Sequence, residues 1–162
     1  MFTCLVTGAK GHTGSFLVKF LLEKGCKVIA TDLPPKERSE LMTKETVFRQ
    51  DFQYMNCEDW DSVSFIPADL TQKETLRPLF KCGQINIIFH PASFYDYFAE
   101  LPILRKINVE GLRNLLDISL EELGDIPRFI HWSTCGVYGE PEYARDTKTK
   151  LPIAADETAP FD

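Results

Sequence analysis

Three glycines near the start of the chain have a spacing that suits a nucleotide phosphate. Gly8, Gly11 and Gly14 follow the apolar run 2–7 and precede an apolar helical segment. Gly8 allows a sharp turn, Gly11 leaves room for a diphosphate, and Gly14 lets the helix pack closely on the strand. Three glycines can also mark an ordinary tight loop, but a strand before them and a helix after them favour a phosphate site. The predicted phosphate-binding residues are Gly8, Gly11, His12, Thr13 and Gly14.

An acidic residue ends the second apolar run, 27–31. Asp32 lies roughly 20 positions beyond the glycines, where a carboxylate accepts hydrogen bonds from the ribose hydroxyls of a dinucleotide. Its negative charge repels the additional phosphate of NADP, so the sequence favours NAD as the cofactor and makes NADP the less favoured one. Asp is also common in turns, and Asp32 stands shortly before Pro34, so a simple turn role is the alternative.

Net charge and composition narrow the classes of protein to which the chain can belong. The 162 residues carry a net charge of −6, and 44% of them are hydrophobic, which suffices for the core of one domain. Lysines and arginines form no cluster, so we expect no nucleic-acid partner and no membrane contact. No apolar run reaches the roughly 18 residues of a membrane-spanning helix, and the first residues lack the basic charge of a signal peptide. These features predict a soluble, cytoplasmic protein.

The five cysteines are scattered, without a pair at CxxC spacing. Such a set supports neither a disulfide framework nor a zinc site, and we expect no metal. Cys135 has no cation or carboxylate beside it in the sequence to activate a thiolate, which argues against a cysteine nucleophile.

Apolar runs alternate with helical segments along the chain. The runs are nearly continuous in apolar residues, which is typical of strands buried on both faces. This order predicts an α/β fold with a Rossmann-type, doubly wound parallel sheet. Ligands of such sheets bind beyond the carboxyl ends of the strands, where the glycines and Asp32 would lie. The expected strands are 2–7, 27–31, 63–66, 85–89 and 128–133.

Sequence patterns also predict the helices between these strands. Phe20 and Leu21 belong to the apolar positions that recur at helical spacing after the glycines. Thr71 and Glu74 have the spacing of a capping box for a second helix. A longer helix is expected to end at Gly124.

Motifs occur in a fixed order along the whole chain: Thr7 to Gly14, Asp32, Ala68-Asp69-Leu70, His90-Pro91-Ala92-Ser93, Asn108 to Gly111 with Asn114-Leu115-Leu116, and Ser133 to Gly139. Taken in order, these motifs resemble those of the extended short-chain dehydrogenase/reductases, the NAD-dependent epimerase/dehydratase group. The resemblance covers essentially the whole chain. It implies an oxidoreductase or epimerase that transfers hydride between a nicotinamide and a small-molecule substrate, such as a sugar nucleotide or a sterol-like alcohol.

The resemblance implies roles for residues at the other strand ends. Asp69 would accept a hydrogen bond from the adenine amino group, and Leu70 would pack against the ring. The path to the nicotinamide ribose would be lined by Pro91, Ala92 and Ser93.

The catalytic groups of the resembled family would lie after the fifth expected strand. Thr134 matches the family's catalytic Ser/Thr, whose hydroxyl bonds the substrate oxygen, and Ser133 would lie beside the nicotinamide. The family's general acid/base is a Tyr with a Lys four positions later. None of the five tyrosines of this chain has a lysine at that distance.

The missing Tyr/Lys pair leads to an expectation about the extent of the domain. Residues 1–162 would form an incomplete NAD(P)-binding Rossmann domain, truncated before its last strands and lacking the substrate-binding part. We expect this chain by itself to be inactive and a full-length parent to be the active enzyme. The resemblance also implies a homodimer for the full-length protein.

Two other functions stay open on the sequence alone. A non-catalytic, NmrA-like dinucleotide sensor would use a similar glycine loop, and residues 11–14 have some of that character. The stretch 133–139 would place a hydroxyl at the nicotinamide end, which a sensor does not need, and it therefore favours an enzyme. A flavodoxin-type mononucleotide module is disfavoured by Asp32. For His90, a core role and a place along the cofactor cleft remain equal alternatives.

Overall fold

A computed structural model of the protein describes residues 1–34, 60–96, 98–134, 137 and 148. It divides the chain into two compact units, Met1–His131 and Trp132–Asp162. The first unit contains a five-stranded parallel sheet with the strand order β3-β2-β1-β4-β5. This order confirms the predicted Rossmann-type sheet. The strands are β1 (Thr3–Val6), β2 (Lys27–Ala30), β3 (Ser64–Phe65), β4 (Ile87–His90) and β5 (Arg128–His131).

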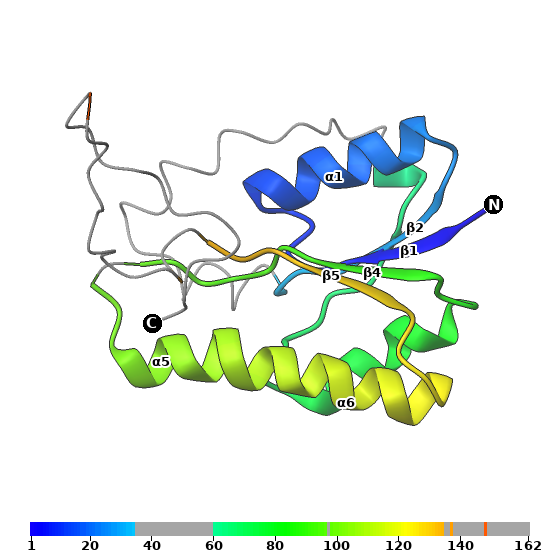
Figure 1. The fold of residues 1–162 in the computed structure, drawn as a ribbon. Helices are drawn as coiled ribbons and strands as arrows, with labels where there is room; N and C mark the ends of the chain where they lie inside the picture. The colour runs from blue at the N-terminus through cyan, green and yellow to red at the C-terminus, as the bar shows by residue number, and fades with distance from the viewer. Residues whose placement is uncertain (35–59, 97, 135–136, 138–147, 149–162) are drawn as a thin grey trace. The chain divides into compact units, whose positions relative to one another are not determined.

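Helices cover both faces of the sheet (Figure 1). Helix α1 (His12–Glu23) lies on one face. The opposite face carries the 3-10 helix η1 (Lys73–Lys81) and a long helix made of three consecutive segments. These segments are α5 (Leu101–Arg105), the π-helical turn η2 (Lys106–Glu110) and α6 (Gly111–Leu123).

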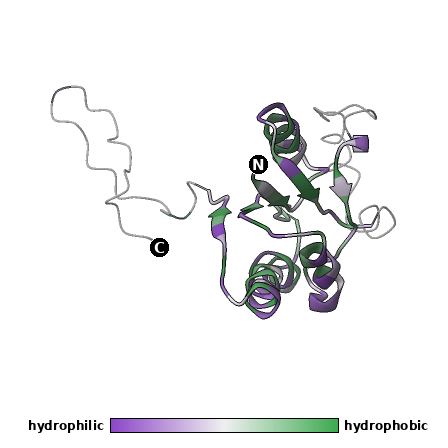
Figure 2. Cartoon of the chain, turned by 90° about the vertical axis from the view of Figure 1, so that its right-hand side faces the viewer, coloured by the Kyte–Doolittle hydropathy of each residue, from purple (hydrophilic) through white to green (hydrophobic). Residues whose placement is uncertain are grey.

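The strand residues alternate between two apolar cores, one under each helical layer. Leu5 of β1 is in register with Ile29 of β2 and Ile88 of β4, and this row faces η1 and α6. The neighbours of Leu5 on β1, Cys4 and Val6, belong to the core beneath α1. Because both faces of the sheet are covered, most positions of the central strands are apolar, and Figure 2 draws much of their length in green.

The buried face of α1 differs from the predicted one. Phe20 is 44% exposed, whereas Val18 and Leu21 are buried against the sheet. Gly14 sets this orientation, because it must face the end of β1, and Val18 and Leu21 follow it on the same side of the helix. The sequence spacing predicted the helix correctly but included a residue of its outer face.

The expected capping box at Thr71 and Glu74 is not formed. The hydroxyl and N–H of Thr71 both donate to the Asp69 carboxylate, and Glu74 bonds to Arg77 instead. The segment is a 3-10 helix that contains Pro78, which has no N–H to donate to an α-helical ladder. The turn before η1 is therefore organised by Asp69.

The long helix ends as predicted but contains an irregular turn. Gly124 follows α6 with a positive φ of 73°, the left-handed conformation that suits glycine at a helix end. The π-helical turn Lys106–Glu110 lies in the middle, and such turns are frequent near functional sites.

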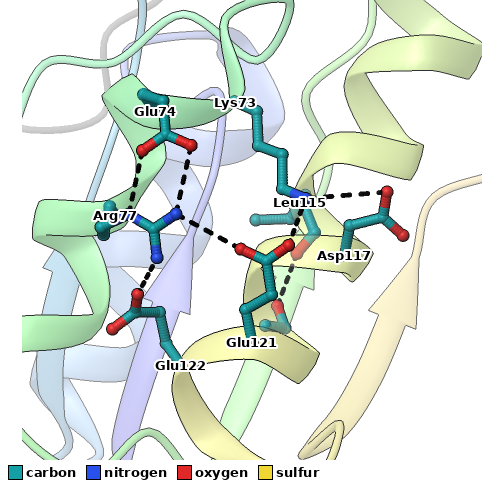
Figure 3. Close-up of polar contacts among 8 residues, drawn as sticks. Lys73, Glu74, Arg77, Leu115, Asp117, Glu121 and Glu122 are labelled. Atoms are coloured by element: carbon teal, nitrogen blue, oxygen red, sulfur yellow. Dashed lines mark hydrogen bonds and ion pairs between the residues drawn. The ribbon is translucent and has the colours of Figure 1, made fainter.

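A network of ion pairs joins η1 to α6 (Figure 3). Arg77 pairs with Glu74 of its own helix at 3.0 Å and with Glu121 and Glu122 of α6. Lys73 pairs with Glu121 at 2.5 Å. Arg77 therefore links two segments that are distant in sequence, and they pack over the core that contains Leu76 and Ile118.

We predict that Arg77→Met lowers the urea midpoint of unfolding, because it removes the cation that joins the two helices while keeping an apolar stem. Raising the salt concentration from about 50 to about 500 mM should shrink the difference from the wild type, since salt screens exposed ion pairs. Arg113→Met, which removes the same charge from α6 at a residue outside this network, is the control. A salt-independent loss of stability would show that packing of the stem, rather than charge, is responsible.

Candidate nucleotide-binding site

The carboxyl end of β1 is bounded by backbone atoms of two other segments. Gly8 has a positive φ of 59°, and a Cβ on it would lie 2.8 Å from the Cα of Ala92. A Cβ on Gly14 would lie 2.0 Å from the carbonyl oxygen of Gly8. Neither position has room for a side chain, so the first turn of α1 comes directly against the end of β1. Gly11 is the N-cap of α1 and has no side chain to cap the helix, which leaves this end suited to an anion.

The exposed residues His12 and Thr13 begin α1. They belong to the first helical turn, whose backbone N–H groups have no partner within the helix itself. The structure thus places all five predicted phosphate-binding residues in one loop and helix start. Their contact with a phosphate stays a prediction.

Asp32 fastens the glycine loop to the end of β2. One carboxylate oxygen accepts the N–H of Lys10 at 2.7 Å, and the other accepts the N–H of Leu33 at 2.8 Å. The Ala9 N–H donates to the carbonyl of Thr31 at 3.0 Å, so backbone and side chain together tie the two strand ends. A carboxylate oxygen can accept more than one hydrogen bond, so these contacts are compatible with bonds from ribose hydroxyls.

The predicted adenine-side residues continue from Asp32. The Ala68 N–H donates to the carbonyl of Asp32 at 3.0 Å, which brings Asp69 next to the end of β2. The Asp69 carboxylate accepts hydrogen bonds from Thr71 and from Gln72. It is therefore already engaged in shaping the turn that precedes η1.

Leu70 is held in place by α6. The Asn114 side chain donates to the Leu70 carbonyl at 2.8 Å. A Cβ on Gly111 would lie 3.0 Å from the Leu70 Cβ, so glycine is what lets α6 approach this turn. Half-buried, Leu70 packs on the core beneath η1 and α6. The sequence signal for this contact was the pair Gly111 and Asn114, three positions apart on one helix.

The turn after β4 carries Pro91, Ala92 and Ser93. Pro91 and Ala92 are half-buried, Ser93 is exposed, and Ala92 contacts Gly8. Asn108 of the π-helical turn bonds both backbone groups of Phe94: its Oδ1 accepts the N–H at 2.7 Å and its Nδ2 donates to the carbonyl at 2.8 Å. The irregular turn of the long helix therefore fixes the segment that follows these three residues.

His90 is a buried histidine beneath this turn. Its Nδ1 lies 2.8 Å from the Thr7 hydroxyl, and its ring stacks on His131 of β5 at 5.4 Å between centroids. It is only 2% exposed. Burial, with a smaller contribution from the nearby His131, lowers the pKa of His90 to about 4, so the ring is neutral at physiological pH. The geometry supports the core role among the two alternatives.

Ser133 and Thr134 follow β5 in the chain and are exposed. They belong to the second unit, in which the Val137 N–H donates to the Thr134 carbonyl at 3.2 Å. Their roles beside the nicotinamide and the substrate stay predictions. Cys135 lies outside the described residues.

Two contributors to the site were not predicted from the sequence. Thr7 provides the hydroxyl beside His90, and Lys10 provides the N–H that Asp32 accepts. Thr7 precedes Gly8, and Lys10 lies between Gly8 and Gly11, so their position in the motif was the available signal. In the part of the chain that the structure describes, no group of three or more His, Cys, Asp or Glu residues could hold a metal. No helix among the described residues is long and apolar enough to cross a membrane.

The sequence profile of the NAD dependent epimerase/dehydratase family matches residues 4–161, and the chain belongs to this family. This confirms the resemblance found in the motifs.

Solved structures share the fold. The UDP-glucose 4-epimerase of Thermus thermophilus in complex with NAD is 26% identical, with a TM-score of 0.65, over 94% of this chain and 44% of that one. The enzyme of the same name from Thermotoga maritima, with UDP-glucose, is 24% identical, with a TM-score of 0.61, over 95% and 45%. WbmH of Bordetella bronchiseptica, in complex with NAD+, is 19% identical, with a TM-score of 0.64, over 96% and 47%. The chain spans less than half the length of these three proteins.

We predict that acid destabilises the protein through His90. In the unfolded chain a histidine takes up a proton below about pH 6.5, whereas folded His90 does so only near pH 4. Between these values the unfolded state binds more protons, so stability falls as the pH decreases, by on the order of 3 kcal/mol in total.

The measurement is urea unfolding at several pH values between 7 and 4. His90→Asn, whose amide can still bond the Thr7 hydroxyl, should lose most of this dependence. His12→Asn changes an exposed histidine and should keep it. Equal slopes in the wild type and His90→Asn would contradict the prediction.

Proposed function

We propose that the chain binds NAD at the carboxyl ends of its strands and forms the cofactor-binding part of an NAD-dependent epimerase/dehydratase. The observation that carries this proposal is the side-chain-free approach of α1 to β1 at Gly8 and Gly14, beside the Asp32 carboxylate. A diphosphate needs close access to backbone N–H groups, and a ribose needs an acceptor at that distance. Membership in the family supports the same function.

In this proposal each segment of the site holds one part of the dinucleotide. The first turn of α1 would direct its N–H groups to the diphosphate. Asp32 would accept hydrogen bonds from the adenosine ribose, since its oxygens already lie at the end of β2. Asp69 and Leu70 would contact the adenine, and the turn with Ala92 would lead towards the nicotinamide ribose.

Bound NAD supplies the hydride acceptor and donor of the reaction. The chain's own contribution to chemistry would come from Thr134, whose hydroxyl would donate a hydrogen bond to the substrate oxygen as negative charge develops there. A small molecule with a carbinol or ketone group is the proposed substrate class. Sugar nucleotides are the favoured members, because the similar solved structures include UDP-glucose 4-epimerases.

The first test is the affinity for NAD and NADP, measured by calorimetry. The wild type should bind NAD more tightly, because the Asp32 carboxylate repels the 2′-phosphate. Asp32→Ala should weaken NAD binding about tenfold or more, since it removes charge-assisted hydrogen bonds.

The control for this test is Asp125→Ala. This variant removes the same charge from the loop that precedes β5. Strand β5 is at the edge of the sheet and is not a neighbour of β2, which Asp32 follows. This variant should bind both nucleotides as the wild type does. Tighter binding of NADP by the wild type, or an unchanged NAD affinity in Asp32→Ala, would refute the ribose assignment.

The second test addresses Thr134 in the active, whole protein. Thr134→Ala should lower kcat roughly 100-fold, the effect of deleting one such donor, while NAD affinity changes little. Thr134→Ser keeps the hydroxyl and should retain much of the rate. If Thr134→Ala weakened NAD binding and left kcat intact, the catalytic assignment would have to move to Ser133.

A further inference from the structure

Two cysteines that are distant in the sequence meet beneath α1. Cys4 of β1 is 1% exposed, and Cys26, in the turn between α1 and β2, is half-buried. Cys4 is part of the apolar core under this helix, and Cys26 packs against the same core. The turn holds Cys26 in place, because its N–H donates to the Leu21 carbonyl at 3.0 Å.

The strand register places both cysteines on one face of the sheet. Cys4 is in register with Val28 of β2, which belongs to the core under α1. Cys26 precedes Val28 by two positions, and side chains at that spacing in an extended chain point to the same face. The chain is already paired with β1 beside Cys26, since the Lys27 N–H donates to the Phe2 carbonyl at 2.9 Å. Cys26 is therefore directed towards the core that contains Cys4.

The two thiols contact each other. Burial, which contributes most, together with the charge of Cys26 and a hydrogen bond to its side chain, raises the pKa of the Cys4 thiol to about 12. A bond that raises the pKa of an acid is one that its protonated form donates, so the Cys4 S–H is the donor and the Cys26 sulfur the acceptor. Cys4 is thus shielded from external reagents, but it touches a second sulfur that a reagent can reach.

We propose that Cys4 and Cys26 form a redox-modification site, at which a low-molecular-weight disulfide is reduced and a disulfide bond between these two cysteines forms. Cys26, the more exposed of the two, reacts first, and Cys4 resolves the mixed disulfide. The inference is independent of the proposed nucleotide function. It concerns the amino-terminal ends of the strands, whereas the glycine loop follows the carboxyl end of β1.

The reaction has two exchange steps. The Cys26 thiolate attacks one sulfur of the external disulfide, whose S–S bond breaks, and one thiolate leaves. The Cys4 sulfur, after losing its proton to water, attacks the Cys26 sulfur, and the second external thiolate leaves. The two protein thiols lose two electrons, which reduce the external disulfide to two thiols, and the two protons that the protein releases balance those that the thiols take up. Because the Cys4 thiolate is scarce at neutral pH, the second step should be slow and should accelerate about tenfold per pH unit.

The bond would close a loop that contains the glycine loop and the whole of α1. A cross-link restricts the unfolded chain and stabilises the folded state as long as the fold accepts it without distortion. The two side chains already face the same core, so we expect the oxidised protein to unfold at a higher urea concentration than the reduced one.

The experiment treats the folded wild type, without denaturant, with oxidised glutathione at about pH 8. Remaining thiols are alkylated, and the protein is digested with trypsin without reduction and analysed by mass spectrometry. Trypsin cleaves after Lys10, Lys24 and Lys27, so the bond should join peptide 1–10 to peptide 25–27. Dithiothreitol should separate the two peptides and restore both thiols.

Three variants assign the two roles and provide a control. Cys4→Ala should accumulate glutathione on Cys26, because no thiol resolves the mixed disulfide. Cys26→Ala should leave buried Cys4 unmodified over the same time. Cys82→Ala is the matched control, since Cys82 is half-buried like Cys26 but packs against the core on the opposite face of the sheet. It should form the linked peptide as the wild type does.

Three results would overturn the inference. The first is a wild type in which Cys26 carries glutathione without ever linking to Cys4. The second is a bond from Cys26 to a cysteine other than Cys4. The third is a linked protein that unfolds at a lower urea concentration than the reduced one, because the fold would then have to distort to make the bond.

Discussion

The arrangement of the site depends on one steric constraint, the absence of a side chain at Gly8. Three segments meet at this residue: the end of β1, the first turn of α1 through Gly14, and the turn after β4 through Ala92. A side chain at either glycine would separate the segments that now touch. Because Gly14 must face β1, the constraint also decides which side of α1 is buried and leaves Phe20 at the surface. The orientation of the helix and the shape of the loop thus have the same cause.

Polar contacts then connect the strand ends that sterics bring together. Asp32 holds the glycine loop through the Lys10 N–H, and its carbonyl holds Ala68, so a single residue joins β1, β2 and the segment after β3. On the other side of β1, the Thr7 hydroxyl meets buried His90. Such bonds contribute more in a half-buried place than at the surface, because the partners would otherwise lose water without replacement.

The long helix positions the opposite part of the site. Asn108 holds the turn after β4 and Asn114 holds Leu70, and the two lie six residues apart in the helix. The π-helical turn at Lys106–Glu110 contains Asn108, so an irregularity in the helix coincides with its contact to the site. The ion pairs of Arg77 join η1 to the same helix and hold the two helical segments of this layer together.

The sequence by itself determined the fold class, the approximate positions of the strands, and the places of the glycine loop after β1 and of Asp32 after β2. It could do so because apolar runs and glycine spacing are local consequences of burial and backbone conformation. It did not determine the contacts between segments. The 3-10 form of η1 depends on Pro78 and Asp69 together, and the buried face of α1 depends on Gly14 meeting β1. The approach of Lys10 to Asp32 and Phe65 joins residues more than 20 positions apart. Only the tertiary structure decided these features, since each arises from groups of separate segments that meet only in the folded chain.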